Sequence, residues 1–316
     1  MTVAAATLMG SVLTAGAQEN YPTKPIRLIV PEVVGSAADL MSRIIGQRIG
    51  EALGQPVTFE NIFLEAGVEK AIKAAPDGYT LMYGSSGNVA LLPHVKKVSF
   101  DPLKDLTPVG RFVIQPTLIA SNPALPVNTL QELVAMIKAN PGKMKASGTG
   151  QGGIWHLAIA GLLKDQGIDP NALPWVPSNG AAPGMQDMIA GGVDVVPCSI
   201  PEARPMIDAG KARALAIMDD NPPALYPNVP TLKKELGTDW KIAAWRVIAA
   251  PKGIPADAQK TLGAALKRVY DSKDYKEFMA SRGFGVVWAD AEGTTKFMAA
   301  SDANLGGALK AVGLAK

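Results

Sequence analysis

The sequence has little of the residues that form cross-links and metal sites. Its 316 residues include a single cysteine, Cys198, and only two histidines, His94 and His156. One cysteine excludes an internal disulfide, and with two histidines it leaves little material for a zinc site. We therefore expect no metal and no cofactor. We interpret Cys198, which follows Val195–Pro197, as a packed residue of low reactivity.

The sequence also lacks a strong excess of positive or negative charge, and it lacks long apolar runs. The 31 basic and 28 acidic residues give a net charge of +3 and are spread along the chain. No basic run is dense enough to follow a phosphate backbone, which argues against nucleic acid as a partner. Beyond the N-terminal segment, no apolar run reaches the roughly 18 residues of a membrane helix, so we expect a soluble mature chain. With 47% hydrophobic residues, the chain can bury the cores of two domains.

The first residues are typical of a secretory signal peptide. An apolar stretch over Val3–Leu13 runs into Ala15–Ala17, which has the small-residue pattern of a cleavage site. We predict a signal peptide over 1–17 and a periplasmic mature protein. Signal peptides usually have a Lys or Arg before the apolar stretch, and this chain has none there. No cysteine follows the stretch to carry a lipid anchor. A buried first helix is the alternative interpretation.

Segments with the periodicity of strands alternate with segments that have the periodicity of helices. Ile26–Val30 is an apolar run between two prolines, as in a buried strand, and Ser36–Leu53 has its apolar residues on one helical face. The alternation continues with strands over Val57–Glu60 and Tyr79–Tyr83, and with helices over Val68–Ala75, after Thr129, over Asp257–Asp271 and over Ala291–Val312. This order of elements predicts an α/β fold.

Two extended apolar stretches, Gly110–Ala120 and Ile242–Ala250, predict crossings between two lobes. The chain would leave lobe one near residue 115 and return near residue 245. We therefore predict lobe one over 22–115 plus 246–316 and lobe two over 116–245. Paired crossings permit hinge closure around a ligand.

Two junctions between a strand and a helix have the features of an anion site. In Pro31–Asp39, Ser36 and Asp39 have the spacing of a helix cap, and the first turn of a helix offers unpaired N–H groups and a partial positive charge. Ser147–His156 contains four glycines, which let the backbone approach a ligand closely. An ordinary capped helix is the alternative in each case. The second loop also fits G-x-G-x-x-G, but no acidic residue is clearly placed on a following strand, which argues against a dinucleotide.

The sequence offers no catalytic pair. Ser86, in the polar cluster Tyr83–Asn88, lacks the glycine two residues later that a nucleophile elbow requires. His156 stands in the first turn of a predicted helix, where unpaired amides disfavour its protonation. We therefore predict a binding protein and not an enzyme.

Several motifs occur in the order and at the separations of one known family. They are Tyr21–Arg27, Leu53–Val57, Pro76–Leu81, Gly150–Leu157, Gly180–Pro183, Val193–Val195, Val229–Thr231 and Trp245. From Tyr21 to its C-terminus the chain closely resembles the substrate receptors of tripartite tricarboxylate transporters, also called the Bug family. The resemblance implies a type II periplasmic-binding-protein fold, in which two lobes, each a mixed sheet flanked by helices, are joined by two crossing strands.

The resemblance also implies partners. Family receptors deliver a small carboxylate to one large and one small membrane permease subunit, and we expect this chain to do so as a monomer. Some family members instead serve two-component systems as sensors, and the sequence does not separate the two roles.

Ligand-binding residues follow from the same resemblance. In the family, the loop after the first strand and the glycine-rich loop of lobe two hold a carboxylate through backbone amides and bound water. Carried across, these positions are Val34, Gly35, Ser36, Asp39, Gly150, Gln151, Gly152, Gly153 and His156. We also predict ligand contacts at Ser85, Ser86 and Asn88 in the polar cluster after the third strand, and at Gly180, Ala181 and Cys198. We expect the amides of Gly152 and Gly153 to face the carboxylate, so that a bulky side chain at Gly152 weakens binding and leaves folding intact.

Departures from the family pattern concern specificity. The first loop reads Glu32–Ser36 where the family has Phe-Pro-Pro-Gly-Gly, so an anion there would feel the Glu32 carboxylate. After the second strand, Ile62–Gly67 is shorter and more apolar than the usual glycine-rich stretch, and Cys198 stands where the family has Asp. Fewer amide donors and more apolar side chains predict a ligand that is less charged and more apolar than citrate, such as an aromatic monocarboxylate.

Overall fold

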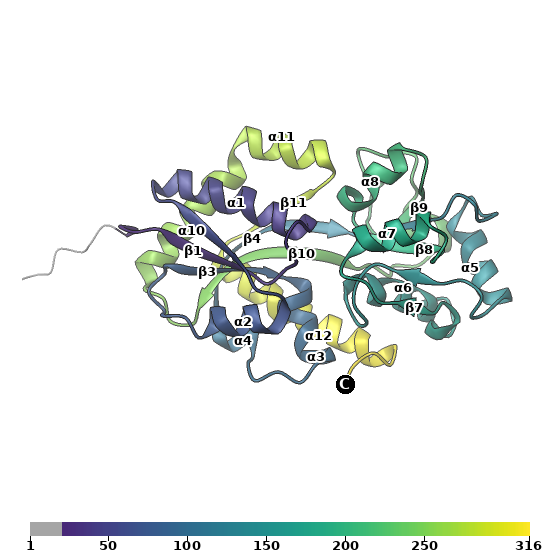
Figure 1. The fold of residues 1–316 in the computed structure, drawn as a ribbon, viewed down its shortest axis with the longest axis horizontal. Helices are drawn as coiled ribbons and strands as arrows, with labels where there is room; N and C mark the ends of the chain where they lie inside the picture. The colour runs from purple at the N-terminus through teal and green to yellow at the C-terminus, as the bar shows by residue number, and fades with distance from the viewer. Residues whose placement is uncertain (1–20) are drawn as a thin grey trace, which may run out of the picture.

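Two mixed β-sheets organise residues 21–316, the part of the chain that the computed structural model describes (Figure 1). Each sheet is flanked by helices and forms one lobe, as the sequence predicts. The predicted signal peptide over 1–17 lies outside the described residues.

The first sheet has six strands in the order β11–β4–β10–β3–β1–β2. They are β1 (Ile26–Val30), β2 (Val57–Asn61), β3 (Thr80–Ser85), β4 (Leu106–Pro116), β10 (Ala243–Pro251) and β11 (Gly285–Ala289). β1 pairs in parallel with β2 and β3, whereas β10 runs antiparallel to β3 and β4. The helices of this lobe are α1 (Ala37–Leu53), α2 (Leu64–Ile72), α3 (Leu92–Val95), α4 (Pro102–Asp105), α10 (Ala256–Asp271), α11 (Lys273–Arg282) and α12 (Ala291–Ala311).

The second sheet has five short strands in the order β7–β6–β8–β5–β9. They are β5 (Leu118–Ser121), β6 (Ala146–Ser147), β7 (Trp175–Val176), β8 (Val195–Cys198) and β9 (Arg213–Ile217). Its helices are α5 (Leu130–Ala139), α6 (Ile154–Asp165), α7 (Ala181–Ile189), α8 (Ile200–Asp208) and α9 (Leu232–Leu236). In Figure 1 these elements form the teal and green half of the molecule, opposite α1 and α10.

The lobes are joined through β4 and β10, which pair with each other from Leu106 opposite Pro251 to Pro116 opposite Ala243. At the point where both segments leave the first sheet, the backbone N–H and the Oγ1 hydroxyl of Thr117 donate to the carbonyl oxygen of Ile242 at 3.2 and 2.7 Å. The predicted lobe limits near residues 115 and 245 fall within these two strands. The division itself stays a prediction.

Local sequence signals account for several element ends. β1 has the predicted bounds, and Ser36 caps α1 by accepting a hydrogen bond from the N–H of Asp39 at 3.1 Å. A capping box of Thr129 and Glu132 opens α5.

Other element limits differ from the expectation. The helix expected over 68–75 begins four residues earlier, at Leu64, and ends at Ile72. The single stretch expected over 110–120 is two strands, β4 and β5, which belong to different sheets. Helix α12 is the longest in the described part of the chain, yet no helix of residues 21–316 is both long and apolar enough to cross a membrane.

Candidate ligand-binding cleft

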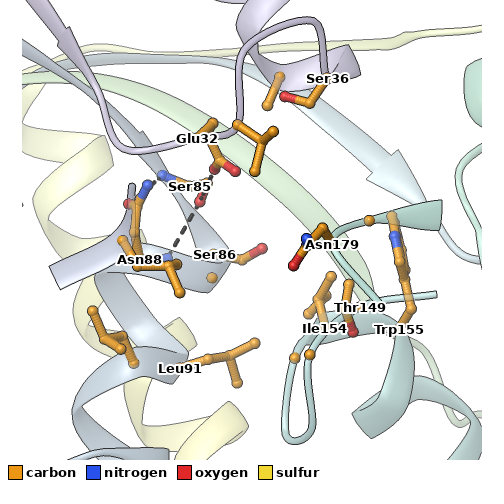
Figure 2. A pocket seen from close by; sticks show the side chains of 18 of the residues that line it. Glu32, Ser36, Ser85, Ser86, Asn88, Leu91, Thr149, Ile154, Trp155 and Asn179 are labelled. Atoms are coloured by element: carbon orange, nitrogen blue, oxygen red, sulfur yellow. Dashed lines mark hydrogen bonds between the residues drawn. The ribbon is translucent and has the colours of Figure 1, made fainter. Parts of the chain in front are cut away.

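A cavity of about 340 Å³ lies between the two lobes (Figure 2). Lobe one contributes the loop after β1, the start of α2 and the π-helix over Ser86–Leu91 that follows β3. Lobe two contributes the glycine-rich loop before α6, the segment before α7 and the first turn of α8. The crossing strands supply Gln115 and Arg246. A molecule in this cavity would therefore contact both lobes.

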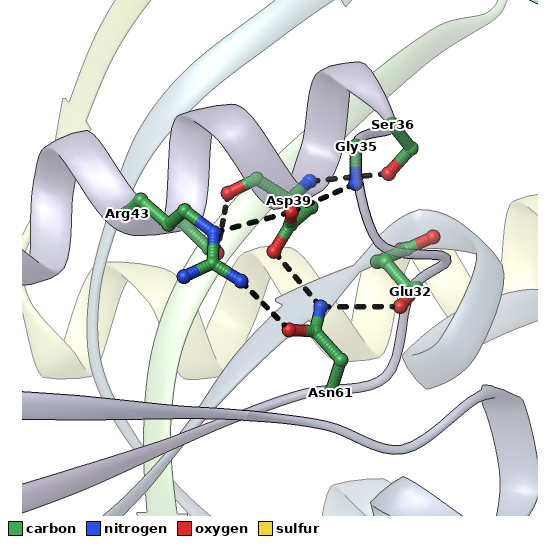
Figure 3. Close-up of polar contacts among 7 residues, drawn as sticks. Glu32, Gly35, Ser36, Asp39, Arg43 and Asn61 are labelled. Carbon is green, nitrogen blue, oxygen red and sulfur yellow. Dashed lines mark hydrogen bonds and ion pairs between the residues drawn. The ribbon is translucent and has the colours of Figure 1, made fainter.

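The loop after β1 is held by the side chain of Asp39, which is only 1% exposed (Figure 3). Its carboxylate accepts hydrogen bonds from the Gly35 N–H at 2.9 Å, from Nδ2 of Asn61 at 2.8 Å and from Nε of Arg43 at 3.2 Å. Burial alone would raise the pKa of Asp39, but these donors together hold it below its usual value. Asp39 thus fixes the shape of the loop and is turned away from the cavity.

The π-helix after β3 presents a second polar group. Oγ of Ser85 donates to Oε1 of Glu32 at 3.0 Å and accepts from the N–H of Asn88 at 3.3 Å, and Oδ1 of Asn88 accepts from the N–H of Ser85 at 2.8 Å. Oγ of Ser86 and Nδ2 of Asn88 have no hydrogen-bond partner among the described residues, although both residues are 1% exposed. Figure 2 shows the Ser86 hydroxyl directed toward the cleft.

The glycine-rich loop of lobe two is arranged differently from our expectation. The N–H of Gly152 donates to Nδ1 of His156 at 3.0 Å, and the N–H of Gly153 donates to the carbonyl of Gly150 at 3.0 Å. Neither amide is therefore free for a carboxylate. His156 is buried, lies parallel to the Trp175 ring at 4.5 Å between centroids, and has its pKa lowered by burial to about 4. The neutral ring is thus a support for the loop.

Gly152 is also constrained sterically. Its φ of +75° lies in the left-handed region, and a Cβ atom at this position would come within 2.7 Å of Cγ1 of Val95 in α3 of lobe one. Any side chain here would therefore strain the backbone, so we expect a bulky residue to lower stability, while its effect on ligand binding stays a prediction.

Part of the cavity wall is apolar. Phe63 and Leu64 at the start of α2, Leu91 and Val95 in lobe one, and Trp155 in lobe two all line it. Such a wall accommodates the carbon skeleton of a small organic molecule, while the polar groups fix its orientation.

Nine of the predicted ligand-binding residues line the cavity and six do not. Those that line it are Ser36, Ser85, Ser86, Asn88, Gly150, Gln151, Gly152, Gly153 and Gly180. Those outside it are Val34, Gly35, Asp39, His156, Ala181 and Cys198. Val34 is 68% exposed on the outer surface of the loop, whereas Ala181 and Cys198 are fully buried in the core of lobe two. Burial raises the pKa of the Cys198 thiol, as expected of an inert packed cysteine.

Sequence reasoning missed six polar residues that line the cavity: Gln115, Thr149, Ser178, Asn179, Glu202 and Arg246. Arg246 had a visible signal, because it is a lone charge within the apolar stretch over 242–250. Glu202 had a misleading one, since Ser199 and Glu202 form a capping box at the start of α8, which explains the pair without any ligand.

Residues 21–316 contain no group of three or more His, Cys, Asp or Glu side chains placed to hold a metal ion. What the cavity offers instead is hydrogen-bonding groups, three charged side chains and an apolar wall. This arrangement can bind and orient a solute.

Two lobes on mixed sheets, joined by paired strands around a shared cavity, define a two-lobed periplasmic binding protein. Comparison with known proteins identifies the family of binding proteins to which the chain belongs. The model of the tripartite tricarboxylate transporter family receptor matches residues 41–314, and the chain belongs to this family. The resemblance predicted from the motifs is thereby confirmed. The protein is a solute-binding protein and not an enzyme, in keeping with its family and its structural neighbours.

Individual relatives agree over nearly the whole chain. BugT of Bordetella pertussis is 31% identical over 290 residues, which are 89% of this chain and 87% of BugT. The periplasmic binding protein BugD is 25% identical with a TM-score of 0.84, covering 94% of this chain and all of that one. MatC of Rhodopseudomonas palustris, solved with bound malate, is 25% identical with a TM-score of 0.80, covering 92% of this chain and all of MatC.

We predict that Asp39→Asn destabilises the protein by about 1.5–3 kcal/mol at pH 7, because an amide nitrogen would face donors that the carboxylate now satisfies. A lowered native pKa stabilises the fold above the ordinary Asp value of about 3.9, and that contribution is lost as the pH falls through the native pKa. The difference from wild type should therefore shrink below about pH 4. Urea unfolding between pH 7 and pH 3 measures it. Asp239→Asn, at an exposed pair with Lys233, is the control and should leave stability nearly unchanged. A pH-independent difference for Asp39→Asn would contradict the assignment.

We predict that Gly152→Ala lowers the free energy of unfolding by at least about 1 kcal/mol, since alanine is strained at positive φ and its methyl group would press on Val95. Gly150→Ala is the matched control in the same loop, because its Cβ would enter open space. Denaturant unfolding of both variants checks this. Equal stability of the two would show that the loop adapts freely.

Proposed function

We propose that this protein captures a small organic carboxylate in the cleft between its lobes and delivers it to the permease subunits of a tripartite tricarboxylate-type transporter. The observation that carries this proposal is the cavity itself, which is lined by both lobes and by the first residues of α6. Family membership supports the transport role.

The N-terminus of α6 supports an anionic ligand. The backbone N–H groups of Ile154, Trp155 and His156 have no acceptor within the described part of the chain, because they belong to the first turn of the helix. Ile154 and Trp155 line the cavity, so a carboxylate placed there would meet unpaired donors and the positive end of the helix dipole. These amides replace those of Gly152 and Gly153 in our proposal.

The malate bound to MatC supports the same ligand class, since it shows a carboxylate held by a relative with the same fold. We further propose that the protein acts in the periplasm as a monomer after cleavage of residues 1–17, and that its lobes close on the ligand by bending at β4 and β10.

A thermal-shift screen over aliphatic, hydroxy, amino and aromatic carboxylic acids tests the proposed ligand class. A ligand at 100 times its dissociation constant stabilises the native state by about 2.7 kcal/mol, which should raise the melting temperature by about 5 °C or more. Amides and alcohols of the same skeletons are the control and should give no shift. A panel in which no acid shifts the transition would refute the proposed function.

Small-angle scattering tests the closure. The radius of gyration should fall when the acid identified in the screen is added at saturation, because the two lobes approach each other. Unchanged dimensions with calorimetrically verified binding would show that the ligand enters a cleft that does not move.

A further inference from the structure

Two acidic side chains and one basic side chain line the cleft. They are Glu32 in the loop after β1 of lobe one, Glu202 in the first turn of α8 in lobe two, and Arg246 on the crossing strand β10. Within the described chain no other Asp, Glu, Lys, Arg or His lines this cavity. With both glutamates ionised, the cleft carries an excess of one negative charge before any ligand enters.

Each carboxylate is oriented by the protein but keeps one oxygen without a partner. Oε1 of Glu32 accepts from Oγ of Ser85 at 3.0 Å, and Oε2 of Glu202 accepts from the N–H and Oγ of Ser199 at 2.9 and 2.6 Å. Among the described residues, Oε2 of Glu32 and Oε1 of Glu202 have neither a hydrogen bond nor an ion pair.

Arg246 does not neutralise the two glutamates by contact. Its Nη1 donates to the carbonyl oxygen of Trp245 at 2.9 Å, and the Arg246 guanidinium forms no ion pair within 4.0 Å among residues 21–316. Its charge still acts on both sites. Burial raises the pKa of Glu32 and of Glu202, and the Arg246 guanidinium offsets only part of this rise in each. Both carboxylates thus lie where a further cation would stabilise them.

Two further buried groups in the cleft indicate a polar ligand. Oγ of Ser86 and Nδ2 of Asn88 are unpartnered among the described residues, both residues are 1% exposed, and both line the cavity on the same side as Glu32. Buried donors without an acceptor are uncommon in folded proteins. Nδ2 of Asn88 can only donate, so it favours a ligand with an acceptor such as a carboxylate oxygen, whereas Oγ of Ser86 can donate or accept.

Charge balance separates the ligands that such a cleft accepts. A dicarboxylate would place two more negative charges beside Glu32 and Glu202, and a monocarboxylate would place one. An amino carboxylate adds no net charge. Its ammonium group can form ion pairs with both glutamates while its carboxylate lies elsewhere in the cavity. Like charges brought together in a buried site disfavour binding, and opposite charges favour it.

We infer that the ligand is an amino carboxylate, with its carboxylate at the N-terminus of α6 and its protonated amine between Glu32 and Glu202. This inference rests on the proposed function and specifies its substrate class. Glu32 and Glu202 come from different lobes, so the ammonium group would join the lobes by contacts to both. Arg246 offsets part of the cost of burying the two glutamates.

Isothermal titration of the full mature chain with probes matched in length tests the inference. The pairs are 4-aminobutanoate and succinate, 5-aminopentanoate and glutarate, and 6-aminohexanoate and adipate, together with butanoate, pentanoate and hexanoate and with α-amino acids of the same carbon number. The best amino carboxylate should bind at least tenfold more tightly than the dicarboxylate and the monocarboxylate of equal length.

Charge-removing variants assign the preference to the two glutamates. Glu32→Gln and Glu202→Gln keep the shape of the side chain and should each weaken amino carboxylate binding at least tenfold, while dicarboxylate binding stays the same or improves. Glu51→Gln, on the exposed face of α1, is the matched control and should bind like wild type. Circular dichroism verifies folding, and if a variant does not fold, the order of affinities in the wild type decides alone.

The outcomes separate this inference from the proposed function. Dicarboxylates or monocarboxylates that equal or exceed the amino carboxylates overturn the inference and leave carboxylate capture standing. The same holds if no amino carboxylate of the series binds but another acid of the thermal-shift panel does. If no acid of either set binds, both the inference and the proposed function fall.

Discussion

The pairing of β4 with β10 is the constraint on which the rest of the structure depends. These strands belong to one sheet but carry the chain into and out of the other, and Thr117 ties them together where they leave the first sheet. Because their backbones are paired, the two lobes have one fixed side and one open side. Gln115 and Arg246 project from the fixed side into the cavity, so the polar floor of the cleft is part of the connection between the lobes.

The loops around the cavity are shaped by side chains that do not face it. Asp39 gathers donors from its own loop, from α1 and from the end of β2, and the neutral His156 ring accepts the amide of Gly152. In both cases a buried side chain satisfies backbone groups that a tight loop leaves unpaired. The loops thus hold their form without ligand, which lowers the ordering cost of binding.

Much of the architecture follows from local signals in the sequence. The apolar run of β1 between prolines and the caps at Ser36 and Thr129 are decided by neighbouring residues. The direction in which a polar side chain points is not decided by its neighbours in the sequence. Asp39 in α1 forms a hydrogen bond with Asn61, 22 positions away at the end of β2, and an argument from spacing could not find this partner. The sequence analysis did not place Glu202 and Arg246 in the site for the same reason. Only the structure, in which the two lobes meet, shows that they line one cavity with Glu32.

The absence of a side chain at Gly152 allows the two lobes to lie close together. The loop of lobe two lies so near Val95 of lobe one that a single methyl group would already be too close. The two lobes therefore lie close together at Gly152 and Val95, where no room is left for a side chain on the glycine. The close approach of the lobes at this point thus depends on residues other than Glu32, Glu202 and Arg246, which carry the charges of the cleft.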